Sequence, residues 1–162
     1  MRRIAICMVG VLILAVLNHA IYSREQLVAQ GRIVFLELAP VDPRSLMQGD
    51  YMALRYTASR QLRNALNSGT PDSGYAVLSL DGRGVAGFKQ VDDGTALTPS
   101  DIRMLYRYRN GHIQFATNAF FFQEGTGKQY EVARYGEFRV GDDGKSILVG
   151  MRDKDLMRLG EK

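Results

Sequence analysis

Three carboxylates of the sequence could belong to one catalytic or binding site. Asp42 and Asp50 flank a polar loop, and Glu124 follows an apolar run far along the chain. Glycosidases use such a pair, with one carboxyl group as general acid and the other as base or nucleophile. Because the sequence does not fix the separation of these carboxylates, a hydrolase or glycan-binding domain is the alternative hypothesis and not the leading one.

A serine and a lysine offer a second chemistry. Ser45 as nucleophile and Lys89 as base would form a Ser-Lys dyad. The segment after Pro43 is similar to the one that follows the nucleophile in type I signal peptidases. Ser45 lies after Pro43 instead of several residues before it, and the Ser-Met pair of that family is missing. We therefore interpret Ser45 as a turn residue.

The counts of cysteine, histidine and charged residues argue against disulfides, metal sites and nucleic-acid binding. Cys7 is the one cysteine of the sequence and there are two histidines, so we expect neither disulfides nor a metal site. The formal net charge of +4 includes Arg2 and Arg3, and the other positive charges are scattered. We therefore expect no nucleic-acid binding, and no pattern indicates a cofactor.

The N-terminal segment predicts a membrane anchor. Residues 4–22 are mostly apolar, and as a helix they would span roughly 28 Å, close to the hydrocarbon core of a bilayer. Arg2 and Arg3 favour a cytoplasmic N-terminus, which predicts a single-pass protein of the inner (cytoplasmic) membrane with a periplasmic, extracytoplasmic domain. A cleaved secretory signal stays open as the alternative, although residues 18–20 lack an Ala-x-Ala site.

After the anchor, the hydrophobic period changes from that of a helix to that of strands. Residues 24–30 are a polar continuation of the helix, which should end at Gly31. Short runs between Gly- and Asp-rich turns predict strands over residues 32–38, 49–56, 75–80, 85–91, 102–109, 112–115, 137–140 and 146–151. Apolar residues at helical spacing predict short helices over residues 57–67 and 126–135.

These elements predict an α+β protein. We expect an N-terminal transmembrane helix followed by a mainly antiparallel β-sheet or small barrel with one or two short helices. A chain of 162 residues without a repeat is expected to hold one such domain. The predicted divisions are the anchor over residues 1–23, a linker or helix extension over 24–31, and the extracytoplasmic domain over 32–162.

The loop and strand over residues 40–56 are the most informative stretch. Pro43 fixes φ, Asp42 can accept backbone N–H bonds, and Gly49 permits a left-handed turn before the strand. Side chains should alternate along this strand, with one set facing outward and the other inward. One set is Tyr51, Ala53 and Arg55, and the other is Met52, Leu54 and Tyr56. A binding edge that includes Arg44 and Asp50 stays open as a functional reading.

Two blocks of sequence carry a family resemblance. Residues 49–56 match every fixed letter of a Gly-Asp-Tyr-x-x-Leu-x-Tyr motif, and residues 120–140 form a second block. On these residues the chain resembles the GDYXXLXY family of bacterial membrane-anchored proteins. The family's activity is not established, so the resemblance implies no catalytic residue. The candidate binding residues are Asp42, Pro43, Arg44, Gly49, Asp50, Tyr51, Leu54, Tyr56, Glu124, Gly125, Tyr130, Arg134, Tyr135 and Gly136.

The leading hypothesis is a non-enzymatic interaction module of the cell envelope. Members of the family are often encoded beside a multi-pass membrane protein, so the resemblance suggests such a protein as a partner. Within the second block, residues 120–122 are three phenylalanines that we expect in the core. Glu124 is expected to form an ion pair with Arg134 or Arg44. If the motif is functional, the two blocks should meet in space.

Overall fold

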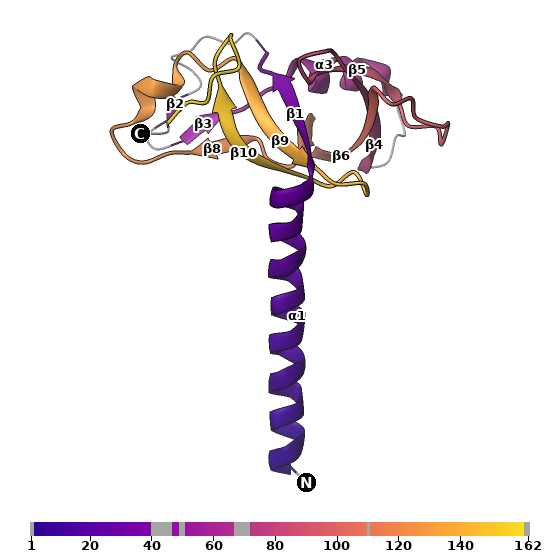
Figure 1. Cartoon of the computed structure of the whole chain (residues 1–162), viewed down its shortest axis with the longest axis vertical. Coiled ribbons are helices and arrows are strands. Elements are labelled where there is room, and N and C mark those ends of the chain that lie inside the picture. Colours follow the sequence, from indigo (N-terminus) through magenta and orange to yellow (C-terminus); the bar gives the residue numbers. More distant parts are fainter. Residues whose placement is uncertain (1, 40–46, 49–50, 67–71, 110, 161–162) are drawn as a thin grey trace.

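A long helix and a β-rich domain make up the molecule (Figure 1). The computed structural model describes residues 2–39, 47–48, 51–66, 72–109 and 111–160. The helix, α1 (Arg2–Gln30), has 29 residues and extends away from the domain. It is long and apolar enough to cross a membrane. The side chains of residues 6–25 are all exposed, because the domain contacts only the last turns of the helix.

The helix is joined to the domain by direct contacts. The Gly31 N–H donates to the Leu27 carbonyl at 2.9 Å, and Arg139 Nη1 donates to the Gly31 carbonyl at 3.3 Å. A Cβ at position 31 would overlap the Leu27 carbonyl oxygen and lie 3.0 Å from the Arg139 Cβ. A glycine is therefore needed where the chain leaves the helix, and it fixes the end of α1 against the sheet.

Two sheets build the domain. The larger has seven strands in the order β10-β9-β1-β5-β4-β6-β7, and within it β1 and β5 pair in parallel while the other neighbours are antiparallel. The smaller, which we call the motif sheet, has the order β2-β3-β8 and is antiparallel. The strands are β1 (Arg32–Glu37), β2 (Met47–Gln48), β3 (Tyr51–Ala53), β4 (Ser73–Leu80), β5 (Val85–Val91), β6 (Asp101–Arg109), β7 (His112–Phe115), β8 (Ala119–Phe121), β9 (Tyr135–Val140) and β10 (Ser146–Arg152).

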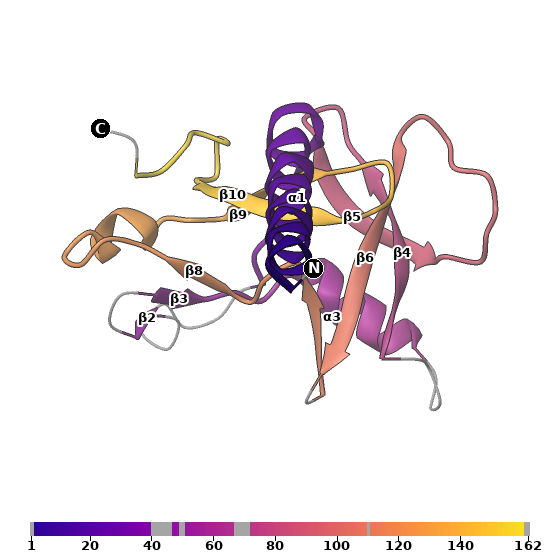
Figure 2. The same ribbon diagram turned by 90° about the horizontal axis from the view of Figure 1, so that it is seen from below.

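The larger sheet curls into a nearly closed barrel, seen from the side of α1 in Figure 2. Its inward-facing residues fill the interior, and Leu36, Leu78, Met104 and Phe138 are fully buried. Helix α3 (Thr57–Ala65) packs on β5, β7 and β1, away from α1 (Figure 1). Its apolar face closes that end of the barrel, because the helix buries Ala58 and Leu62.

The predicted α+β architecture is confirmed, with an N-terminal apolar helix, a mostly antiparallel barrel-like sheet and one further short α-helix. The helix predicted over residues 126–135 is wrong. Only the 3₁₀ helix η1 (Gly127–Tyr130) forms there. Tyr135 and Gly136 instead enter β9, opposite Glu37 and Leu36 of β1. Strand pairing therefore outweighs the weak helical spacing of this segment.

Candidate functional site

The two sequence blocks meet in the motif sheet. Strand β3 of the first block pairs with β8 of the second, with Tyr51 opposite Phe121 and Met52 opposite Phe120. The rings of Tyr51 and Phe121 lie 5.7 Å apart at a tilt of 42°. Blocks about 70 residues apart in the chain thus form one structural unit, as cross-strand aromatic pairs stabilise a sheet.

Tyr56, the last fixed letter of the motif, is a core residue. Its side chain is 3% exposed, and its ring packs edge-on against Phe138 with centroids 5.4 Å apart. A Cβ at Gly136 would lie 3.1 Å from this ring, so the second block leaves room for the tyrosine of the first. Burial raises the pKa of Tyr56 well above its usual value, so the hydroxyl stays protonated. Among the described residues, that hydroxyl has no hydrogen-bond partner.

The alternation predicted for this strand is confirmed. Met52 and Leu54 are buried with Tyr56, whereas Tyr51 and Ala53 are half-buried and Arg55 is exposed. Leu54 is thereby placed in the core. The other candidates of the first block, Asp42, Pro43, Arg44, Gly49 and Asp50, lie outside the described residues, as does Ser45.

The second block is less buried than expected. Phe121 is 73% exposed, whereas Phe120 and Phe122 are half-buried and contact Tyr130 at centroid distances of 5.1 and 5.3 Å. The prediction of three core phenylalanines is therefore wrong for Phe121. Alternation explains the difference, because neighbouring residues of β8 point to opposite faces.

The expected ion pair of Glu124 is not formed with Arg134. Both side chains are exposed, and neither takes part in an ion pair among the described residues. Gly125 follows in the same exposed connection, while Tyr135 and Gly136 lie in β9. The carboxylate hypothesis stays a prediction, because Asp42 and Asp50 lie outside the described part of the chain. No group of three or more His, Cys, Asp or Glu among the described residues is arranged to hold a metal ion.

An open cavity of about 1020 Å³ lies between the end of α1 and the two sheets. We call it the anchor groove. It is lined by residues drawn from 20–32 of α1 and its exit, 105–109 of β6, 114–121 of β7 and β8, and 140–148 of the β9–β10 hairpin. These elements surround α1 in Figure 2. Phe121 also lines the groove, so the motif sheet forms one of its walls.

The anchor groove is basic. Five of its lining residues are cationic and two are acidic, namely Arg24, Arg32, Arg107, Arg109 and Lys145 against Asp142 and Asp143. Two of the cations are engaged: Lys145 pairs with Asp143 at 2.7 Å, and Arg32 donates to the carbonyls of Pro99 and Asp101. The side chains of Arg24, Arg107 and Arg109 form no hydrogen bond or ion pair with any described residue. The groove is thus suited to an anionic ligand.

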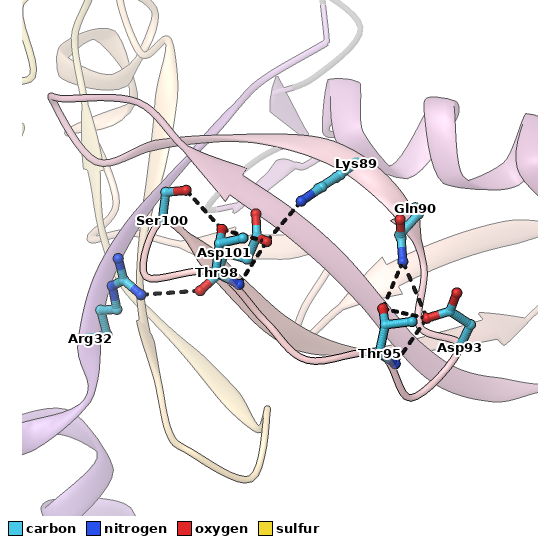
Figure 3. Close-up of polar contacts among 8 residues, drawn as sticks. All are labelled: Arg32, Lys89, Gln90, Asp93, Thr95, Thr98, Ser100 and Asp101. Atoms are coloured by element: carbon cyan, nitrogen blue, oxygen red, sulfur yellow. Dashed lines mark hydrogen bonds and ion pairs between the residues drawn. The ribbon is translucent and has the colours of Figure 1, made fainter.

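A polar cluster beside the groove fixes the β5–β6 connection (Figure 3). Asp101, whose side chain is buried, accepts from Lys89 Nζ at 2.8 Å and from Thr98 Oγ1 at 2.7 Å. The Lys89 hydrogen bond, with those from Thr98, lowers the pKa of Asp101 to about 2. Lys89 is therefore the ion-pair partner of a buried carboxylate, which is not the setting that a Ser-Lys dyad requires.

Sequence reasoning missed both the groove arginines and Asp101. Arg107 and Arg109 are two residues apart and therefore lie on the same face of a predicted strand, a pattern that could have indicated the groove. The run Thr98-Pro99-Ser100-Asp101 has the composition of a side-chain-capped turn, which was a usable signal for the cluster. Neither sequence pattern predicts which other helices and strands lie next to these residues in the folded protein.

Comparison with protein families identifies the chain. A model of the GDYXXLXY protein family matches residues 13–151, which include the C-terminal part of α1, both sequence blocks and most of the barrel. The chain belongs to this family. Comparison with curated proteins and with solved structures gave no match. In this GDYXXLXY protein, the described part of the family motif has a structural role, since Leu54 and Tyr56 fill the core and Tyr51 pairs with the second block.

Proposed function

We propose that this GDYXXLXY protein is a membrane-anchored, non-enzymatic interaction module that binds a multi-pass membrane protein of the cell envelope. Helix α1 would cross the inner membrane once, with Arg2 and Arg3 in the cytoplasm and the domain in the periplasm. The exposure of every side chain over residues 6–25 supports the membrane crossing, because an apolar helix needs lipid or protein around it.

The position of Phe121 carries the proposal for a protein partner. Its side chain is 73% exposed and lies beside Tyr51 on the wall of the anchor groove, next to the end of α1. Aromatic residues are enriched in the buried centres of protein interfaces, and an exposed phenylalanine beside a half-buried tyrosine is suited to that role. A protein embedded beside α1 could reach this position, so helix and motif sheet would present one continuous binding surface.

Photocrosslinking tests this surface. A benzophenone amino acid at position 121 should trap one membrane protein in intact cells. The matched control is position 97, another exposed apolar residue, which lies in the β5–β6 connection outside the groove. The same products from both positions, or none above background from position 121, would contradict the proposal.

The anchor is tested separately. The full 162-residue chain should remain in the membrane after alkaline extraction, with its intact mass unchanged. A chain shortened by a segment of about 20 residues, found in the soluble fraction, would show that the N-terminal segment is a cleaved signal.

A further inference from the structure

We propose that the anchor groove binds the phosphate of an anionic phospholipid from the leaflet next to the domain, through Arg24, Arg107 and Arg109. This inference rests on the anchoring part of the proposed function and not on the protein partner. Its ligand is the membrane lipid itself, recognised by its phosphate and by the apolar part attached to it.

The position of the groove along α1 is the first argument. Ala20, inside the predicted span, and Ser23, just beyond it, both line the same cavity as Arg107 and Arg109. The rise from Ala20 to Arg24 is roughly 6 Å, about the depth of the headgroup layer on one side of a bilayer. The groove would therefore open at the level where lipid phosphates lie.

The state of the arginines is the second argument. On the outer face of β6, Arg103 pairs with Asp92 at 2.6 Å, but Arg107 and Arg109 have no partner among the described residues. Their neighbours on β7 are Gln114 and His112, which add no negative charge at neutral pH. A guanidinium binds phosphate through two parallel hydrogen bonds, so these side chains are suited to a phosphate group.

The apolar walls are the third argument. Leu27 of α1, Leu105 of β6, Leu148 of β10 and Phe121 of β8 line the groove together with the arginines. A free inorganic anion makes no use of such walls, whereas the glycerol and first acyl carbons of a lipid would cover them. The direct contacts at Gly31 hold α1 against β9, so the groove keeps its place beside the membrane.

Native mass spectrometry of the full chain tests the inference. The protein is reconstituted in nanodiscs of phosphatidylcholine with a minority of phosphatidylglycerol, released into detergent, and its retained lipids are counted. We expect retained phosphatidylglycerol to exceed its share of the bilayer. In R107Q/R109Q this enrichment should fall by about 25-fold, because each basic residue at an anionic surface contributes on the order of a fivefold change in binding.

A matched control has the same charge change elsewhere. Arg60 and Arg63 are exposed on α3, which lies at the end of the barrel away from α1 (Figure 1), and R60Q/R63Q should keep the enrichment. An equal loss in the two double variants would overturn the inference, since it would show attraction by net charge alone. No enrichment in the unchanged protein would overturn it as well.

A competition arm separates lipid from free anion. Millimolar inorganic phosphate or glycerol phosphate should leave the retained phosphatidylglycerol unchanged. Displacement by either would overturn the assignment to lipid and make the groove a site for soluble anions. Crosslinking from position 121 in R107Q/R109Q distinguishes the two proposals, since loss of the lipid with retained crosslinking assigns the arginines to lipid alone.

Discussion

The described residues of the family motif and the anchor groove use their side chains in opposite ways. In the first block, Tyr56 and Leu54 turn inward, and the ring of Tyr56 packs against Phe138 and Gly136. In the groove, the guanidinium groups of Arg107 and Arg109 turn outward and have no partner among the described residues. One region is completed by its own packing, whereas the other presents charge to something outside the chain.

This difference separates the residues that identify the family from the residues that could bind a ligand. The described motif residues are explained by packing, because each fills the core or pairs two strands. The groove arginines are exposed, form no described ion pair and lie beside α1, where an anionic ligand could bind them. Variants in the two regions should therefore have different consequences for the stability of the protein.

Tyr56→Ala should cost about 4 kcal/mol in the free energy of unfolding, because it leaves a cavity between Phe138 and Gly136. Chemical denaturation of the detergent-solubilised protein measures this change. The matched control is Tyr51→Ala, at a half-buried position of the same motif, where we expect a clearly smaller loss. Equal losses would contradict the assignment of Tyr56 to the core.

Arg152→Leu should cost about 3 kcal/mol, because it leaves the buried carboxylate of Glu137 without its partner at 2.6 Å. The double change Glu137→Leu with Arg152→Leu should recover most of that loss, since no buried charge would then remain. Denaturation of the two variants gives the comparison. If the double variant were less stable than Arg152→Leu, the ion pair would contribute more to the free energy of unfolding than the compensation of a buried charge.

Asp101→Asn should lower the unfolding temperature at pH 7, but by less than Arg152→Leu, since Lys89 is half-exposed. The pKa of Asp101 is lowered to about 2 in the folded state. Its carboxylate therefore stabilises the fold above its unfolded pKa near 4, and this contribution is lost as the pH falls toward 2. Thermal melts of both proteins between pH 7 and pH 2 should converge at the acid end. A constant difference at every pH would exclude the charge as the cause.

Tyr56→Phe should raise the free energy of unfolding by about 1 kcal/mol, because the buried hydroxyl of Tyr56 has no partner among the described residues. The ring, and hence the contact with Phe138, is kept. Destabilisation by the same change would mean that the hydroxyl is hydrogen-bonded in solution.

R107Q/R109Q should change the free energy of unfolding by less than about 0.5 kcal/mol, since both side chains are exposed and form no hydrogen bond or ion pair with a described residue. This is the sharpest contrast with Tyr56→Ala. A large loss in the free energy of unfolding would show that these arginines contribute to packing, and the two regions would then not differ.

Local patterns predicted much of the fold. The helix over the apolar run of residues 4–22, the pairing of the strands on either side of residues 110–111 and the alternation around Leu54 depend on neighbours in sequence, and each formed as expected. The helix predicted over residues 126–135 failed because Tyr135 pairs with Glu37, about a hundred residues away. Local spacing has no information on such a partner.

The apolar N-terminal helix, the strand-rich domain and the family could be predicted from the amino-acid sequence, because periodicity, turn chemistry and motif letters are local properties. The packing of Tyr56 against Gly136 and the pairing of Lys89 with Asp101 became evident only in the folded chain. The fold also places Arg24 and Arg107 in the lining of one groove at the end of α1. These juxtapositions depend on how the barrel closes and on the direction in which α1 leaves it, which are set by long-range pairing.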